Sequence, residues 1–213
     1  MSEYNREQLE ALQIVSNYLK MLPLAGLARL KRRVANYVAF RRQVDEFLRR
    51  HFSRICTRRC YQNHHSACCN REGITTFFAD VIINVLMSSD KDINELLRVL
   101  SVPNLGMKCV YLGKQGCLWR VKPIVCEMFL CEHARKIVFD KDPSVSCEWK
   151  KIRRREKRYT WPTRPVLFDE LETYFIHKGF SCSLMYFHNS PGLLRVKALA
   201  QKKAKQKATK RYA

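Results

Sequence analysis

The feature that most constrains this chain is a set of eight cysteines in two separate groups. The first group lies in "CTRRCYQNHHSACC", residues 56–69, and the second in "CVYLGKQGCLWRVKPIVCEMFLC", residues 109–131. A chain of 213 residues can bury a core without covalent cross-links. The N-terminal "MSEYNREQLEALQ" lacks the basic flank and apolar run of a secretory leader. We therefore expect a cytoplasmic protein whose clustered thiols hold a metal or carry redox chemistry instead of forming disulfides.

The clustered cysteines are the candidate metal ligands. A thiolate site needs several sulfur atoms within about 2.3 Å of one ion. Adjacent cysteines point in different directions on most backbones, so the doubled cysteine allows one ion in a sharply bent loop, two ions, or one ligand beside a buried thiol. The predicted ligands are Cys56, Cys60, Cys68, Cys69, Cys109, Cys117, Cys126 and Cys131, with His64 and His65 as additional candidates.

The spacing of these cysteines differs from the paired two-residue gaps of ordinary zinc fingers and from the ferredoxin run. The second group resembles the YkgJ-like cysteine-cluster family, whose order is a cysteine, an aromatic–leucine pair, a turn, a cysteine, an aromatic residue, an Arg-Pro pair and a further cysteine; here Lys122 stands in place of the arginine before Pro123. The first group is similar to that family's first half and ends in its doubled cysteine, although its first gaps are longer.

This resemblance covers Cys56 to Cys131. It implies a zinc- or iron-chelating CxxCxxCC domain, with an iron–sulfur cluster as one form of the iron. It implies no particular reaction, and one branch of the family resembles flagellin lysine methylases.

Hydrophobic periodicity predicts a mainly α fold, an irregular helical domain organised around the cysteine-rich centre. Apolar residues recur at three- and four-residue steps over residues 7–22 and 27–52, whereas residues 55–73 have no clear period and are predicted to form an irregular loop. Further helices are predicted from Thr75 or Thr76 to Leu86, over "SSDKDINELLRVL", from Pro123 to about Phe139, over "DPSVSCEWKKIRRREKR" and over "RPVLFDELETYFIHKGF", and residues 106–122 allow a short hairpin.

The chain divides by composition into N-terminal basic helices (1–54), a cysteine-cluster helical domain (55–190) and a basic tail (191–213) expected to be a frayed helix or disordered. The formal charge is +21, yet residues 60–149 hold ten basic and ten acidic side chains. The excess therefore lies in basic segments that either form solvated helix faces or contact nucleic acid or another polyanion. The candidate contacts are Arg153, Arg154, Arg155, Lys157 and Arg158, with Tyr159 and Trp161 as base-stacking partners.

Other side chains are assigned structural roles. Trp119 and Phe129 are expected to form a dry wall beside the cysteines, His133 to face solvent, and Cys147 and Cys182 to be buried apolar residues. Five acidic residues in the middle of the chain are expected to be surface charges and helix caps: Asp80, Asp90, Asp92, Glu127 and Glu132. The longest apolar run, "FFADVIINVLM", is too short to span a bilayer, so no membrane partner is expected.

Three functions follow as hypotheses. The first is a metal-binding cysteine-cluster protein. The second is a nucleic-acid or ribosome-associated basic protein with a structural metal. The third is a metal-dependent or protein-modifying enzyme such as a lysine methylase, although the chain lacks a phosphate-cradling glycine loop, a helical zinc-protease signature and a nucleophile-elbow serine.

Overall fold

The computed structural model describes residues 2–66, 68–70 and 75–209 and is mainly α-helical, which confirms the predicted fold class. In chain order the elements are α1 (Glu3–Met21), α2 (Leu24–Ser53), the π-helix η1 (Arg54–Tyr61), α3 (Phe78–Met87), α4 (Asp90–Ser101), β1 (Leu112–Gly113), β2 (Gly116–Cys117), α5 (Ile124–Glu127), α6 (Glu132–Lys141), α7 (Pro143–Thr160), α8 (Leu167–Ile176) and α9 (Pro191–Thr209).

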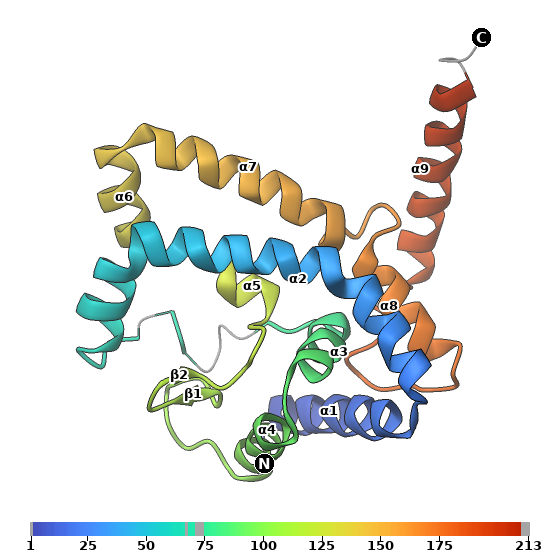
Figure 1. Cartoon of the computed structure of the whole chain (residues 1–213), viewed down its shortest axis with the longest axis horizontal. Helices are drawn as coiled ribbons and strands as arrows, with labels where there is room; N and C mark the ends of the chain where they lie inside the picture. The colour runs from blue at the N-terminus through green and yellow to red at the C-terminus, as the bar shows by residue number, and fades with distance from the viewer. Residues whose placement is uncertain (1, 67, 71–74, 210–213) are drawn as a thin grey trace.

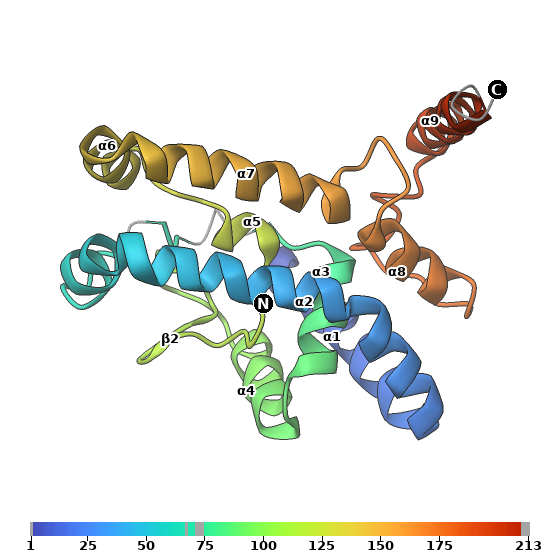
Figure 2. The same ribbon diagram turned by 45° about the horizontal axis from the view of Figure 1, so that its top comes forward.

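The long helix α2 crosses the whole molecule and carries its core (Figure 1). Val34, Tyr37, Val44 and Phe47 recur at helical spacing along one face and are all buried. The helix contacts α6 and α7 on one side and α3 on the other. Figures 1 and 2 show α7 running beside α2 for much of its length, so the basic helix α7 and the cysteine-bearing segments share this one helix as their support.

Helix α3 is the most apolar element and is buried on all sides. Every residue from Phe78 to Leu86 is buried, because α1, α2 and α8 pack around it. A helix that is apolar all round belongs in the interior of a protein. Two of its buried residues, Asp80 and Asn84, are polar and face the segment that leads to Cys126, as described below.

Several predicted helix ends are confirmed. The Ser89 hydroxyl accepts a hydrogen bond from the Asp92 amide and caps α4. Pro143 occupies the first turn of α7, and Gly179 has a φ of +83°, the left-handed conformation that follows a helix end. The hairpin allowed between residues 106 and 122 forms from β1 and β2, and Gly116, the first residue of β2, has a φ of +113°.

Two predicted elements differ from the structure. Residues 55–61, expected to be irregular, belong to the π-helix η1, which continues α2. The single helix expected from Pro123 to Phe139 is two helices, α5 and α6, separated by Met128–Leu130. Each has its own N-terminal cap residue, Pro123 for α5 and Cys131 for α6, so the chain turns between them and presents Cys126 and Cys131 from different helices.

The basic tail is helical from Pro191 to Thr209, and residues 210–213 lie outside the described part of the chain. Figures 1 and 2 show α9 projecting away from the body of the molecule. Its base is fixed by Lys197, which is buried and donates hydrogen bonds to the Asp169 carboxylate and the His188 carbonyl. Among the described helices, none is both long enough and apolar enough to cross a membrane.

Candidate metal centre

The first two candidate ligands, Cys56 and Cys60, lie on η1. A π-helix closes its turns with i→i+5 hydrogen bonds, here from the Gln62 amide to the Thr57 carbonyl (2.9 Å) and from the His65 amide to the Cys60 carbonyl (2.9 Å). Its wide turn places residues four apart on nearly the same face, so both thiols point from one side of η1. Single π-turns within helices are frequent at functional sites.

The loop after η1 returns the doubled cysteine to the second group. His64 and Ser66 have positive φ values of 59° and 38°, a conformation that non-glycine residues rarely adopt. The Cys109 amide then donates a 3.0 Å hydrogen bond to the Cys69 carbonyl, and the Lys108 ammonium donates to the His65 carbonyl. The two cysteine groups, forty residues apart along the chain, are therefore joined backbone to backbone.

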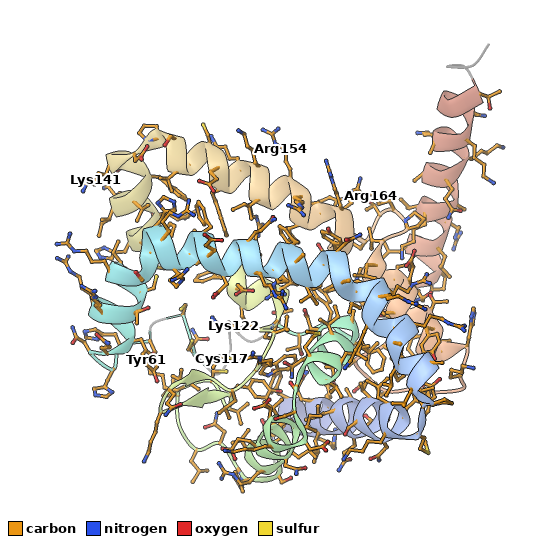
Figure 3. All side chains as sticks on the ribbon, in the orientation of Figure 1. Tyr61, Cys117, Lys122, Lys141, Arg154 and Arg164 are labelled. Carbon is orange, nitrogen blue, oxygen red and sulfur yellow. The ribbon has the colours of Figure 1, made fainter. Side chains whose placement is uncertain are left out.

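The hairpin holds Cys109 and Cys117 close together. Leu112 donates to the Cys109 carbonyl, and Leu118 donates to the Tyr111 carbonyl across the hairpin. The Tyr61 hydroxyl, at the end of η1, donates a 3.0 Å hydrogen bond to the Gly113 carbonyl. Figure 3 labels Tyr61, Cys117 and Lys122 along the path from η1 through the hairpin to α5. The π-helix and the hairpin thus face each other across the candidate centre.

Cys126 and Cys131 enter from the two short helices. Cys126 lies in α5, and Cys131 is the cap residue of α6, where its sulfur accepts a 3.4 Å hydrogen bond from the Ala134 amide. A helix N-terminus favours negative charge, so the position suits a thiolate. His64, His65 and His133 are all exposed, which confirms the expectation for His133.

The thiols influence one another across the two groups of the sequence. Burial first, and then the neighbouring thiols Cys68, Cys131 and Cys60, raise the pKa of Cys56 to about 11. The pKa of Cys69 responds first to Cys68 and then to Cys109, Cys117 and Cys126, and Cys68 also acts on the pKa of Cys126. We call Cys56, Cys60, Cys68 and Cys131 the π-helix cluster. We call Cys69, Cys109, Cys117 and Cys126 the hairpin cluster.

The doubled cysteine links the two clusters. The Cys68 thiol donates a hydrogen bond to the Cys69 sulfur, which lowers the pKa of Cys69 and raises that of Cys68. Burial raises the pKa of Cys109 to about 12 and that of Cys126 to about 11, and the neighbouring Cys117 thiol adds to both shifts. All eight cysteines are free thiols. Each cluster combines cysteines from both groups of the sequence.

The clustered thiols do not form a coordination sphere in the described part of the chain. Within residues 2–66, 68–70 and 75–209, no three Cys, His, Asp or Glu side chains are arranged to hold an ion. The donor chemistry nevertheless fits a thiophilic metal, since four cysteines in each cluster supply the set used for zinc and for iron–sulfur centres. The Asn70–Lys108 bridge and the Cys69–Cys109 hydrogen bond provide the backbone frame around which the side chains can close.

A buried polar network that the sequence analysis missed supports α5. Arg41 of α2 donates to the Glu127 carboxylate, with Nε 2.7 Å from an oxygen, and also to the Lys122 carbonyl and the Tyr37 hydroxyl. Both members of the ion pair are buried. Glu127 follows Cys126 directly, so this ion pair fixes the helix that carries a candidate ligand.

Helix α3 holds the same segment from its other side. The Ile124 amide donates to the Asp80 carboxylate (3.1 Å), and the Val121 amide donates to the Asn84 side-chain oxygen (2.9 Å). Asp80 also accepts from the Phe77 amide at the start of α3, so it is a helix cap as predicted. The prediction that Asp80 and Glu127 are surface charges is wrong, because Arg41 and backbone amides satisfy both carboxylates in the interior.

Burial raises the pKa of Asp80 to about 7, against the opposing effects of Arg41 and two backbone amides. A carboxyl with a raised pKa in the folded state contributes stability at low pH that is lost as the pH rises through that value. We expect Asp80→Asn to become more stable relative to the wild type as the pH rises from about 4 to about 7, by at most about 1.4 kcal/mol per pH unit. Urea unfolding of both proteins across this range, with reductant and chelator present, measures the difference; a difference independent of pH would contradict it.

Other predicted residues have mixed outcomes. Trp119 is buried against Tyr111, as expected of a dry wall, but Phe129 is 55% exposed because it lies in the turn between α5 and α6. Cys182 is buried, whereas Cys147 is exposed on the outer face of α7. Asp90 and Glu132 are exposed, and Asp92 is half-buried where it caps α4 with Ser89, as predicted for surface charges and caps.

The predicted polyanion surface lies on α7. Arg153, Arg154, Lys157 and Arg158 are exposed, while Arg155 is half-buried over the Phe40 ring. Tyr159 is half-buried and stacks on Phe40 with ring centroids 5.5 Å apart, so Phe40 covers part of its ring. Trp161 is 42% exposed and remains available.

The fold defines a mainly α-helical protein. Comparison of the chain with protein-family models, with curated proteins and with solved structures finds no match. Functional inference for this chain therefore depends on its own residues.

Proposed function

We propose that this protein binds metal through its eight clustered cysteines, with one ion or cluster in the π-helix cluster and another in the hairpin cluster. The observation that carries the proposal is the meeting of the two sequence groups, since the Cys109 amide donates a 3.0 Å hydrogen bond to the Cys69 carbonyl. The pKa shifts agree with this meeting: Cys69 responds to Cys68, Cys109, Cys117 and Cys126, and Cys56 responds to Cys60, Cys68 and Cys131. Adjacent cysteines point in different directions, so one ion cannot easily bind both Cys68 and Cys69. With two ions, each of the two cysteines can bind a different one.

The same arrangement explains why the thiols stay protonated without metal. Thiols buried beside one another cannot all ionise, since each new thiolate raises the pKa of its neighbours. A divalent cation reverses this balance, because it stabilises every thiolate around it and compensates their mutual repulsion. Each cluster contains thiols whose pKa is raised, Cys56 and Cys68 in one and Cys109, Cys117 and Cys126 in the other, and a bound cation would stabilise their thiolates.

The metal is zinc or iron. Four thiolates suit tetrahedral zinc and also the iron of an iron–sulfur cluster. Colour distinguishes the two directly: a brown, air-sensitive preparation indicates iron, and a colourless preparation with stoichiometric zinc indicates a structural site. With eight cysteine sulfurs as the donors, the ion supplies a fold-stabilising cross-link, and the protein's own residues orient the thiols and limit the access of water.

Zinc binding is expected to release protons. Because the pKa values of Cys56, Cys109 and Cys126 are raised above the ordinary thiol value, these groups carry protons at neutral pH that zinc must displace. Titration of the reduced, metal-free protein with zinc in weak buffer should therefore acidify the solution, and the apparent affinity should rise as the pH is raised from about 6 to about 8. The sign follows from the competition between protons and metal for the same sulfur atoms.

The titration includes its own control. The Cys147→Ser variant loses an exposed thiol outside both clusters and should release the same number of protons as the wild type. Zinc that binds without proton release, or with an affinity independent of pH, would show that the clustered thiols are not its ligands.

A further inference from the structure

A groove of about 510 Å³ lies between α7 and the segment that joins α5 to α6. Three aromatic side chains on its walls are largely exposed: Phe129 (55%), Phe187 (49%) and Trp161 (42%). Single exposed apolar side chains are common on proteins, but several large aromatic rings gathered in one groove mark a binding surface. The volume falls within the range of roughly 300–1,000 Å³ that is typical of ligand sites.

The groove is also cationic. Arg135 of α6 and Arg153 of α7 line it. Glu156 lines it as well, but its carboxylate accepts a hydrogen bond from the Thr160 hydroxyl and lies 3.9 Å from the Arg153 guanidinium. The Lys157 ammonium lies 4.4 Å from the Trp161 ring centroid, so a cation accompanies the exposed indole.

The cationic surface continues beyond the groove along α7. Arg154 and Arg158 are exposed on the same helix. Figure 3 shows Arg154 projecting from α7 on the side away from α2, and Arg164 in the segment after the helix. A ligand seated in the groove would therefore meet further positive charge if it extended along α7.

We propose that this groove binds single-stranded nucleic acid, with unpaired bases stacked on Phe129, Trp161 and Phe187 and phosphates facing Arg135 and Arg153. Unpaired bases present flat faces that stack on any aromatic ring, whereas a duplex hides those faces in its own stack. An acidic peptide would satisfy the arginines and leave the aromatic rings uncovered. An apolar peptide would cover the rings and bury the guanidinium groups without partners.

The binding test uses the metal-loaded full chain and a fluorescently labelled oligouridylate of about 12 nucleotides. Fluorescence anisotropy should show tighter binding of the single strand than of a duplex of equal length, and Trp161 emission should be quenched on binding. The Trp161→Phe variant should still bind the strand but lose most of the quenching, which assigns the signal to this residue and not to Trp119 or Trp149.

Substitutions in the groove should weaken the binding of the strand. Phe129→Ala and Phe187→Ala each remove a stacking surface. Each should weaken the binding of the strand by a factor between about 5 and somewhat over 100. The control is Leu105→Ala, which truncates a side chain that is 92% exposed outside the groove and should change affinity little.

Arg153→Gln should reduce the slope of log affinity against log salt by about 0.7, because it removes one phosphate contact. Arg29→Gln, an equal charge change at an exposed position on α2, should leave the quenching intact.

Two results would overturn the proposal. Equal binding of duplex or polyglutamate at the same salt concentration would show that the protein is only a general polyion binder. Equal affinities of Phe129→Ala and Leu105→Ala would show that the groove is not the site. Metal content is measured on the same samples, because the groove residues lie outside both cysteine clusters. A protein that holds its metal but does not bind the strand would contradict only the nucleic-acid proposal.

Discussion

Replacing Cys117 and Cys126 together with serine is expected to remove one of two bound ions and to lower the melting temperature substantially. Both residues belong to the hairpin cluster, so two of its four thiolates would be lost while the π-helix cluster stays complete. At free metal about 1,000-fold above the dissociation constant, loss of an ion removes about 4 kcal/mol of stability, which lowers the melting temperature of a chain of this size by about 8–16 °C. Metal analysis and thermal unfolding measure the two effects.

Two further variants complete this experiment. Cys56→Ser with Cys131→Ser should remove the other ion and leave the hairpin cluster loaded. Cys147→Ser, which changes an exposed cysteine on α7, should retain both ions and the wild-type melting temperature. Loss of both ions, or of neither, from each double variant would contradict the division into two clusters.

Arg41→Met is expected to destabilise the protein by about 3–5 kcal/mol. The substitution leaves the Glu127 carboxylate buried without its cation, and a buried unpaired charge is far more costly than a missing pair. Because Glu127 adjoins Cys126, metal retention in the hairpin cluster should weaken as well. Urea unfolding and metal analysis at neutral pH measure both consequences.

The neighbouring Arg42 provides a matched control. It is exposed on the same helix, so Arg42→Met should change stability by less than about 0.5 kcal/mol. The double variant Arg41→Met with Glu127→Leu replaces the pair by apolar side chains and should recover much of the loss. Equal stabilities of Arg41→Met and Arg42→Met would show that the buried pair does not support α5.

The helical architecture was predictable because it depends on local signals. Periodic apolar residues in α2, the Ser89 cap of α4, Pro143 at the start of α7 and Gly179 after α8 each act within a few residues of the chain. The π-helix was not predictable in this way. A π-helix has no distinct apolar period in the sequence, and residues 55–61 were therefore predicted to form part of an irregular loop.

The buried ion pair was missed for a different reason. Arg41 lies in a strongly basic segment, and its charge suggested a solvated face. Its position in the sequence indicates burial instead, because Arg41 is four residues after Tyr37 and three before Val44, on the apolar face of α2. An arginine at a core position of a helix requires a buried partner. The identity of that partner, 86 residues away, follows only from the tertiary fold.

For the candidate centre, the sequence indicated which cysteines matter but not how they divide. In the sequence the cysteines form two separate groups. In the structure each cluster contains cysteines from both groups. The mixing results from the Cys69–Cys109 backbone hydrogen bond and from the turn that separates α5 from α6. Both features depend on contacts between distant segments, which spacing alone does not specify.

Native mass spectrometry of anaerobically purified protein, with metal analysis of the same sample, tests the central proposal most directly. The proposal predicts a folded chain whose mass exceeds that of the polypeptide by two zinc ions or by iron-containing centres, with all eight clustered thiols protected from alkylation until a chelator is added. A folded, metal-free chain whose clustered cysteines react freely would contradict it.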